Sequence, residues 1–398
     1  MRQRINIVFL YPSHKIGGAQ LLFIRLANEM SLRKGVKVYI VDYKKGFLHK
    51  NINTNPRIEK LLYHKSSFEP PQNALIITPL SNLSDISLMI KSNLNKLKIL
   101  FWSIHPKNLE FALNSNLRYF LIDKTKAIKE IERLLDFNTI YFMDEPNVHE
   151  AKKIIENLNI TNYLPIPIPN WKPYKIKSVI NTKDQNKINL CWLGRVSYDK
   201  YHSILKLISE IESSLYRDRI NLHIIGDGDK LITVKKKAAQ FDLPIFFTGT
   251  LENKTLEKYL TTKIDIGVGM GTSCMEFAVR KIPAFLIDYS EAKIIIDLRY
   301  DWIFETNNYN LGSHVNETFR KHSFDDIIYQ FKTDNTISDK CYEYVAKNHQ
   351  LSKVADMIIE SFEKTPLVTN TNFSKVSKAL NPKYYRLFYK YYRILRKF

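Results

Sequence analysis

The sequence predicts an α/β protein built from two doubly wound parallel sheets that face each other across a cleft. Three observations support this prediction. Short apolar strands alternate with helical stretches through most of the 398 residues, a proline-rich segment interrupts the alternation near its middle, and glycines follow several of the strands. A strand, a helix and a second strand in succession form a parallel unit whose helix covers one face of the sheet.

The first half opens with a strand, a glycine loop and a helix. The β-branched run from Ile5 to Tyr11 is the strand, Gly17 and Gly18 lie in the loop, and the apolar stretch 21–30 is the helix. The same reasoning predicts strands at 36–42, 74–78, 98–104, 119–123 and 139–143, and helices at 83–94, 107–114 and 124–137.

The second half repeats the alternation after a proline-rich linker. Four prolines stand in an extended segment, at Pro165, Pro167, Pro169 and Pro173. Beyond it we expect strands at 188–193, 221–225, 245–248, 264–268 and 284–287, and helices at 201–215, 229–240, 253–261, from 272 onward and at 336–364. The predicted parts are an N-terminal Rossmann-like acceptor domain (1–168), a linker (169–175), a C-terminal Rossmann-like nucleotide-binding domain (176–365) and a tail (366–398).

Composition narrows the class of protein. The apolar content of 44% is that of a globular protein, and we find neither an apolar run of membrane-spanning length nor a signal peptide. Three widely spaced cysteines, Cys191, Cys274 and Cys341, predict reduced core residues. We expect a cytoplasmic chain. The net charge of +20 predicts a polyanionic partner, which is nucleic acid, an anionic membrane surface or a phosphorylated ligand.

Part of the positive charge is concentrated at the carboxyl end. Residues 367–398 contain eight Lys or Arg and no acid. From Lys383 to Phe398 apolar residues recur at helical spacing, with the basic residues off that stripe. This pattern predicts a basic amphipathic helix that holds the protein peripherally on the inner, anionic face of the cell membrane. Packing of the helix on the body of the protein is the alternative.

Cations and glycines gather at the predicted carboxyl ends of strands in the second half. Gly194 and Arg195 follow the strand 188–193, and Lys200 comes five residues after Arg195. An arginine can hold phosphate oxygens bidentately and a lysine adds a second charge, so the pair suits a diphosphate. Further glycines follow the next strands, at Gly226, Gly228, Gly249, Gly269 and Gly271. Glycines let backbone amides approach an anion closely.

In order and spacing these motifs resemble those of the retaining nucleotide-sugar glycosyltransferases of the GT-B fold, the family-4 group. The matching residues are Gly17-Gly18-Ala19-Gln20, His105, Pro169-Asn170, Gly194-Arg195, Lys200, Gly226-Asp227-Gly228, Phe247-Thr248-Gly249, Gly269-Met270-Gly271 and Glu276. The resemblance spans residues 5 to about 362. It implies the GT-B architecture and sugar transfer from a nucleotide donor.

The resemblance also implies a role for each matching residue. Arg195 and Lys200 would be catalytic, stabilising the charge that builds on the donor diphosphate, and His105 would contact the donor sugar. The implied donor-binding residues are Gly17, Gly18, Gly194, Gly226, Asp227, Gly249, Gly269, Met270, Gly271, Thr272, Ser273 and Glu276. Within this set, the amides of residues 271–273 would bind phosphate and Glu276 would bind the ribose.

Val268 departs from the family pattern, which has a glutamate eight residues before the one matched by Glu276. A valine cannot hydrogen-bond a sugar, so either other groups, such as the amides near Met270, hold the sugar or the loop is less active. We expect no cofactor and no metal, because no Asp-x-Asp suited to a divalent ion stands at a strand end and the two cations can replace the charge of a metal ion.

The leading hypothesis is a hexosyltransferase-type enzyme that moves a sugar from a UDP- or GDP-linked donor, with retention, to a lipid-linked or surface polysaccharide acceptor. Lipopolysaccharide, O-antigen and capsule biosynthesis are the expected settings. A sugar-nucleotide epimerase of the same architecture and a catalytically weak partner subunit are the alternatives. A nucleic-acid binder would explain the charge but not the glycines at the strand ends. The sequence leaves open the sugar, the base, the acceptor and the oligomeric state.

Overall fold

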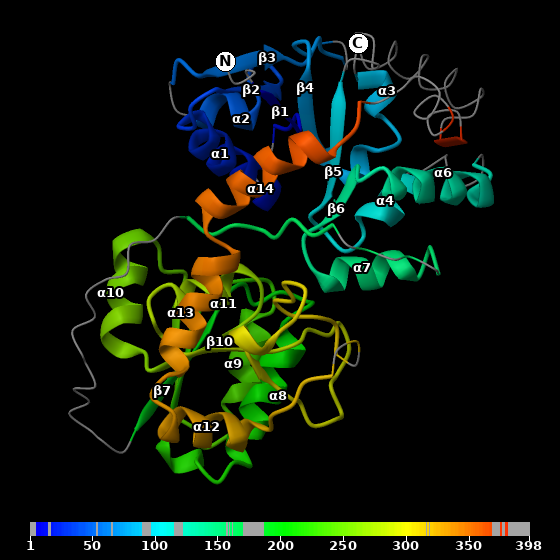
Figure 1. Ribbon diagram of the computed structural model, residues 1–398. Coiled ribbons are helices and arrows are strands. Elements are labelled where there is room, and N and C mark those ends of the chain that lie inside the picture. The colour runs from blue at the N-terminus through cyan, green and yellow to red at the C-terminus, as the bar shows by residue number, and fades with distance from the viewer. Residues whose placement is uncertain are drawn as a thin grey trace. The chain divides into compact units, whose positions relative to one another are not determined.

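The computed structural model divides the chain into two compact units. Unit 1 contains residues 1–169 and 351–398, and unit 2 contains residues 170–350. The structure describes residues 5–14, 17–52, 55–64, 67–89, 97–114, 122–156, 158, 160, 162–169, 187–315, 317, 319–367, 375 and 379–380. Each unit is an α/β layer structure in which helices lie against a sheet (Figure 1).

The sheet of unit 1 has six strands in the order β3-β2-β1-β4-β5-β6, all parallel. The strands are β1 (Ile5–Leu10), β2 (Val36–Asp42), β3 (Ile58–Leu62), β4 (Ala74–Pro79), β5 (Lys98–Ser103) and β6 (Ile140–Phe142). All except β3 were predicted. β3 is an edge strand with two exposed charged residues, Glu59 and Lys60, so it lacks the continuous apolar run of the buried strands.

Helices cover both faces of this sheet. They are α1 (Gly18–Ser31), α2 (Phe47–Asn51), α3 (Ile86–Met89), α4 (Asn108–Asn114), α6 (Lys124–Asp136), α7 (Glu145–Lys152) and α14 (Leu351–Lys364), with the 3-10 turn η1 (Leu80–Asn82). Within the predicted helix 83–94, the structure has the helix α3 at Ile86–Met89, and residues 90–96 lie outside the described residues. Residues 119–121 of the predicted strand 119–123 also lie outside the described residues, and the described residues 122 and 123 are not in a strand.

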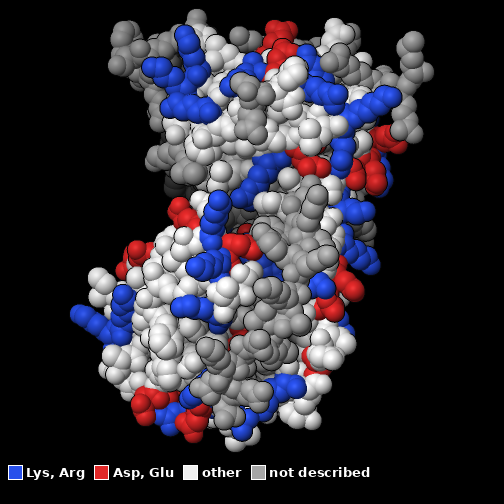
Figure 2. All heavy atoms as spheres, turned by 90° about the vertical axis from the view of Figure 1, so that its left-hand side faces the viewer, with Lys and Arg blue, Asp and Glu red and all other residues white. Residues whose placement is uncertain are grey.

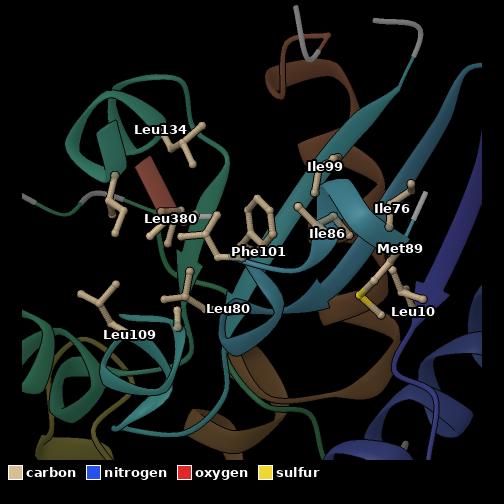
Figure 3. Packing of buried hydrophobic residues seen from close by; sticks show 14 of the residues in the cluster. Leu10, Ile76, Leu80, Ile86, Met89, Ile99, Phe101, Leu109, Leu134 and Leu380 are labelled. Carbon is tan, nitrogen blue, oxygen red and sulfur yellow. The ribbon is translucent and has the colours of Figure 1, made fainter. Parts of the chain in front are cut away.

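The two faces of the sheet carry separate apolar cores. On β1, Ile7 and Phe9 join the core that contains residues of α1 and α14, whereas Val8 and Leu10 join the core that contains residues of α3, α4 and α6. Figure 3 shows the second core, in which Leu10 and Phe101 are labelled. Because successive residues of a strand point to opposite faces, a strand covered on both sides is apolar at every position.

Unit 2 repeats the strand order of unit 1. Its sheet has the order β12-β11-β10-β7-β8-β9. The strand order reverses between β7 and β10, so the first three strands of the unit lie on one side of that point and the last three on the other. The strands are β7 (Ile188–Leu193), β8 (Ile220–Ile225), β9 (Ile245–Gly249), β10 (Ile266–Gly269), β11 (Ala284–Leu286) and β12 (Asp301–Trp302). All neighbours are parallel except β11 and β12, and β12 was not predicted.

The helices of unit 2 follow the predicted alternation. They are α8 (Tyr201–Glu212), α9 (Leu231–Ala238), α10 (Asn253–Lys263), α11 (Thr272–Ala278), α12 (Phe324–Thr333) and α13 (Ile337–Asn348), with 3-10 turns η3 (Arg217–Arg219) and η4 (Ile303–Glu305). The helix α12 was not predicted. Its N-cap is Ser323, whose side chain forms a capping box with Asp326.

The predicted helix 336–364 is two helices in different units. α13 ends at Asn348 in unit 2, and α14 starts at Leu351, whose amide donates to the carbonyl of Ile168 over 3.0 Å in unit 1. The buried residues Val354 and Ile358 of α14 belong to the core of unit 1 beside α1. The structure therefore ends the second domain near residue 350, whereas the sequence placed its end at 365. The apolar stripe of α14 predicted that one face of the helix is buried, but it did not indicate which of the two sheets the helix covers.

Most of the predicted tail lies outside the described residues, including the proposed membrane helix 383–398. One described residue, Leu380, is fully buried in the core shown in Figure 3. The stretch before the basic segment is thus anchored on unit 1. No helix among the described residues is long and apolar enough to cross a membrane.

A buried carboxylate opens α7 at the carboxyl end of β6. The Oδ1 atom of Asp144 accepts hydrogen bonds from the backbone N (3.0 Å) and the Nδ2 atom (2.6 Å) of Asn147. Asn147 in turn accepts from the Ser103 hydroxyl over 3.0 Å. Burial raises the pKa of Asp144 to about 6, against the opposing effect of the hydrogen bonds from Asn147.

This pKa predicts that Asp144→Asn stabilises the protein at neutral pH. The folded pKa of about 6 lies above the ordinary value of 3.8, so the stability contributed by Asp144 is greatest below pH 3.8 and is lost as the pH rises through 6. The loss amounts to roughly 2 to 3 kcal/mol, and an asparagine keeps the cap without a charge. In urea unfolding at pH 4, 6 and 8, the unfolding free energy of the variant should increase relative to that of the parent as the pH rises.

Asp123→Asn is the matched control. Asp123 caps α6 in the same way, accepting from the Lys126 amide over 3.1 Å, but it is exposed. We expect no gain in its unfolding free energy at pH 8. Equal stability of the parent and Asp144→Asn at pH 8 would contradict the assignment of a buried charge at Asp144.

Candidate functional site

The strand order of unit 2 reverses between β7 and β10, and the predicted site residues of this unit gather at the carboxyl ends of the strands there. Gly194 follows β7, Gly226 follows β8, and Gly249 and Gly269 end β9 and β10. Backbone hydrogen bonds join the loops, from the Gly194 amide to the carbonyl of Ile225 (3.0 Å) and from the Gly226 amide to the carbonyl of Gly249 (2.9 Å). A reversal point at this edge is where open α/β sheets bind ligands.

The loops after β7 and β8 pack backbone against backbone. Gly226 has a φ of +140°, and a Cβ atom there would lie 2.0 Å from the carbonyl oxygen of Gly194. At Gly228 a Cβ atom would lie 2.4 Å from the carbonyl oxygen of Val196. The carbonyl of Asp227 accepts from the Val196 amide over 3.0 Å. Only glycine fits at position 226, because both the space and the backbone conformation exclude a side chain.

The loop after β10 lies against the end of β7 and the loop that follows it. A Cβ atom on Gly194 would lie 3.3 Å from the Ser273 hydroxyl, and one on Gly269 would lie 3.7 Å from the carbonyl oxygen of Leu193. α11 then begins at Thr272 without a side-chain cap. The segments predicted to bind a diphosphate, 194–195 and 269–273, are therefore neighbours.

One predicted amide is not available to a ligand. The Gly271 amide donates to the carbonyl of Leu311 over 2.6 Å, so the expectation that it binds phosphate is wrong. Gly271 has a φ of +59°, which turns the chain into α11. Met270 packs against Gly312, where a Cβ atom would lie 2.8 Å from the Met270 Cβ. The amides of Thr272 and Ser273, in the first turn of α11, remain candidates.

Arg195 and Lys200 carry the positive charge of the site. Arg195 is exposed, and Lys200 is half-buried at the residue before α8. Burial lowers the pKa of Lys200, and the nearby charge of Arg195 lowers it further, while Asp199 opposes the shift. The Asp199 carboxylate accepts from the Ser197 hydroxyl over 2.5 Å. Neither cation forms an ion pair with a carboxylate of the residues that the structure describes.

Glu276 is held by an arginine of its own helix turn. Its Oε2 atom pairs with Arg280 Nη1 at 2.5 Å, and Arg280 also pairs with Glu257 at 2.6 Å. Arg280 is buried and Glu276 is half-buried. The second carboxylate oxygen of Glu276 is left for a further donor, and its predicted role on a ribose stays a prediction.

Val268 lies in the core and not at the edge of the sheet. Its side chain is fully buried in β10, where it pairs with Trp192 on β7 and Phe285 on β11. A carboxylate at this position would lose its hydration between two largely apolar side chains, of which only Trp192 carries a donor, the buried Nε1–H. The buried valine thus fits the surrounding residues, and this position of the strand contributes no polar group to the site.

His105 follows β5 in unit 1 and is held as a neutral donor. Its Nδ1 atom accepts from the Lys107 amide over 3.1 Å, which places the proton of the neutral ring on Nε2. Partial burial lowers its pKa, and the charge of Lys107 adds to the effect. The amide of His105 donates to Asn108 Oδ1 over 3.1 Å, which fixes the turn after the strand.

Gly17 and Gly18 begin α1 at the carboxyl end of β1. A Cβ atom on Gly18 would meet nothing within 4 Å, so packing within unit 1 does not require glycine there. Asp42, at the end of β2, stands where dinucleotide-binding sheets place an acid on the ribose. Here its two oxygens accept from the amides of Ser13 (2.9 Å) and Leu48 (2.7 Å), so Asp42 anchors the loop and does not offer a free carboxylate.

One group of three possible metal ligands occurs among the described residues, at Asp301, Glu305 and His322. Gln330 Oε1 accepts from Trp302 Nε1 (2.7 Å), so Gln330 Nε2 donates to His322 Nδ1 (3.0 Å). His322 Nε2 must then carry the proton that it donates to Glu305 over 3.1 Å. A metal ion would need the lone pair of His322 Nε2, and that nitrogen carries a proton in this hydrogen-bond network. The network therefore leaves no histidine ligand for a metal ion.

The segment that supports the loop after β10 was not predicted from the sequence. This segment, residues 310–313, provides the carbonyl of Leu311 for the Gly271 amide and packs Gly312 against Met270. The run Asn310-Leu-Gly-Ser313 is a turn signal that could have located it. Its contact with residues 270–271 joins positions 40 apart and has no local signal.

No protein-family model and no curated protein matches the sequence. Solved structures match nearly the whole chain. HepE from Anabaena, in complex with UDP and glucose, is 13% identical with a TM-score of 0.50, over 90% of this chain and 99% of that one. Sucrose-phosphate synthase from Thermosynechococcus elongatus is 13% identical with a TM-score of 0.55, over 91% and 99%.

A glycosyltransferase from Rickettsia africae is also 13% identical, with a TM-score of 0.55 over 92% of this chain and 99% of that one. At identities this low, the structural likeness shows the fold alone. The chain has the GT-B fold of two Rossmann-like domains, as the sequence predicted.

The packing of the loops predicts that Gly226→Ala destabilises unit 2. An added Cβ would displace the Gly194 carbonyl, and the φ of +140° adds strain, so we expect a loss of roughly 2 kcal/mol or more of unfolding free energy. Gly249→Ala is the control, because Gly249 has a φ of +69° but open space around it. That variant should lose only about 1 to 2 kcal/mol from the backbone conformation. Equal losses in urea unfolding would contradict the close contact.

Proposed function

We propose that this chain is a glycosyltransferase that moves a sugar from a nucleoside-diphosphate donor to a hydroxyl acceptor. One observation carries the proposal. Arg195 and Lys200, without ion-pair partners among the described residues, lie in the loop after β7 at the reversal point of the unit 2 sheet. A doubly charged anion such as a diphosphate is the ligand whose charge matches this pair.

The chemistry follows from the charges. The bond between the anomeric carbon and the diphosphate oxygen breaks, and the electron pair leaves with the diphosphate. The acceptor hydroxyl oxygen forms the new bond to that carbon, and its proton passes to the departing diphosphate. Arg195 and Lys200 stabilise the charge that builds on the leaving diphosphate, which lowers the barrier without a metal ion. Lys200 is already partly desolvated, so it gives up little hydration when the anion arrives.

The glycines shape the place for the donor. Gly194, Gly226 and Gly269 bring the loops after β7, β8 and β10 together without side chains between them. We propose that the Thr272 and Ser273 amides contribute to holding the phosphates. Gly249 borders the base, and the free oxygen of Glu276 accepts from the ribose. Since Val268 is buried, we propose that the backbone near Met270 holds the donor sugar in place of the family's glutamate.

Unit 1 supplies the remaining proposed contacts. His105 offers Nε2–H to a hydroxyl of the donor sugar, and its lowered pKa keeps the ring neutral at pH 7. At the start of α1 the space beside Gly18 is open, which suits an approach to a phosphate or sugar, whereas the Gln20 side chain lies beside Gly17.

We propose a retaining transfer to a lipid-linked or surface polysaccharide acceptor at the inner face of the cell membrane. Support comes from the basic amphipathic sequence of residues 383–398. The solved structure of HepE contains UDP and glucose, which supports a nucleotide-sugar donor for the shared fold. On the face shown in Figure 2, Lys and Arg side chains are interspersed with Asp and Glu, so that face gives no support to a nucleic-acid binder.

Nucleotide binding tests the proposal. Calorimetry should show that the protein binds UDP or GDP more tightly than UMP or GMP, and that EDTA leaves the affinity unchanged. Arg195→Ala and Lys200→Ala should each weaken binding by roughly 10- to 100-fold, because each removes a hydrogen bond to a charged group.

Arg219→Ala is the matched control. Arg219 is an exposed arginine directly before β8, at the edge of the sheet opposite the site, and its loss should leave the affinity unchanged. If no nucleoside diphosphate binds, the transferase assignment fails. If UDP binds and a UDP-sugar is converted to its epimer without an acceptor, the epimerase alternative is correct. Binding without any turnover would instead favour the partner-subunit alternative.

The tail predicts a separate membrane measurement. The chain should sediment with vesicles that contain anionic lipid and not with neutral vesicles, and deletion of residues 383–398 should abolish this. Each basic residue near the surface contributes roughly 1 kcal/mol, and added salt should weaken binding. Full sedimentation of the deletion variant would refute the role of the tail and leave the transferase proposal intact.

A further inference from the structure

The segment 310–313 supports the anion loop from behind. We call residues 310–313 the support turn and residues 269–273 the anion loop. The carbonyl of Leu311 accepts the Gly271 amide at 2.6 Å, and Gly312, with a φ of +123°, leaves only enough room for Met270. The position of the anion loop therefore depends on the position of the support turn.

Asn310 and Ser313 fold the support turn. The Oδ1 atom of Asn310 accepts from the Gly312 amide over 2.9 Å, and its Nδ2 atom donates to the Ser313 hydroxyl over 3.0 Å. Both side chains are buried, with 1% exposure each. Buried polar groups that satisfy one another in this way hold one backbone conformation.

Arg320 fixes the support turn to the end of β11. It is one of the largest fully buried side chains in the described part of the chain, with 2% exposure. Its Nε and Nη2 atoms donate to the two oxygens of Asp288, at 2.7 and 2.5 Å. The Oδ1 atom of Asp288 also accepts from the amide of Ser313 over 2.8 Å. The ion pair thus ends directly on the support turn.

We propose that Arg320 is a positioning residue for the anion site of the proposed glycosyltransferase. Through Asp288 and the support turn it sets the Gly271 backbone, and the anion loop carries Ser273 against Gly194. The proposal rests on the function proposed above. Arg320 touches no ligand in this mechanism, and its guanidinium acts by holding the end of β11 and the support turn in one geometry.

The planar fork of Arg320 explains why lysine would not replace it. A lysine ammonium keeps the charge but cannot span both oxygens of Asp288 in the same plane. Asn310→Ala provides a second perturbation, because it keeps the ion pair of Arg320 and Asp288. It removes the hydrogen bonds that fold the support turn, together with a long contact of 3.5 Å from Arg320 Nη2 to Asn310 Oδ1. Two variants that act on different links of the same chain of contacts should have the same effect on the anion loop.

The control needs a buried hydrogen bond in unit 2 that does not touch the support turn. Tyr300 is fully buried, and its hydroxyl donates to Glu210 over 2.6 Å. Tyr300→Phe removes that hydrogen bond at nearly constant volume. It should lower the stability of unit 2 while leaving the anion loop in place.

The experiment measures nucleotide affinity and amide exchange in the full chain. With UDP or GDP as the probe, Arg320→Lys and Asn310→Ala should each bind about 5- to 30-fold more weakly, and Tyr300→Phe should bind like the parent. Hydrogen exchange of the ligand-free proteins should be at least tenfold faster at the Gly271 amide in the first two variants and unchanged there in Tyr300→Phe.

Two results would overturn the proposal. One is a loss of affinity in Tyr300→Phe equal to that in the other two variants, which would reduce the effect to stability alone. The other is unchanged exchange at Gly271 in Arg320→Lys and Asn310→Ala. A parent that binds no nucleoside diphosphate would refute the proposed function instead, and the exchange at Gly271 would still decide whether Arg320 holds the anion loop.

Discussion

The absence of a side chain at Gly226 is the constraint on which the candidate site depends. The backbone of this residue passes so close to the carbonyl of Gly194 that a Cβ atom would lie 2.0 Å from it. This close approach brings the loops after β7 and β8 together, and a Cβ atom on Gly194 would in turn lie 3.3 Å from the hydroxyl of Ser273, at the start of α11. With no side chain to fill the place, the two cations of the β7 loop and the amides after β10 can serve one ligand.

The alternation of strands and helices predicted the architecture because both sheets are buried on two faces. A buried parallel strand must be apolar at every position, and such runs are visible in a sequence. The exceptions were strands at the edge, such as β3 with Glu59 and Lys60. The glycines and cations of the candidate site were also predictable, because each is a single residue directly after a strand that the sequence already located.

Long-range contacts were not predictable in the same way. Nothing in Asn348-His-Gln-Leu351 marks the end of a helix by glycine or proline, yet the chain leaves unit 2 there. The apolar stripe of α14 is satisfied equally well by either sheet, and only packing decides. Likewise the Gly271 amide finds its acceptor 40 residues away, and Arg320 reaches Asp288 over 32 residues. Such pairings depend on the folded backbone, which local spacing does not describe.

The assignment of α14 to unit 1 has a consequence for the order of folding during synthesis. Unit 1 begins at the amino end of the chain, but its sheet face beside α1 stays uncovered until residues 351–364 have been made. All of unit 2 is synthesised before that point. Synthesis of unit 2 begins after that of unit 1 but ends before it. The apolar residues of β1 in the core beside α14 therefore lack this helix while all of unit 2 is synthesised.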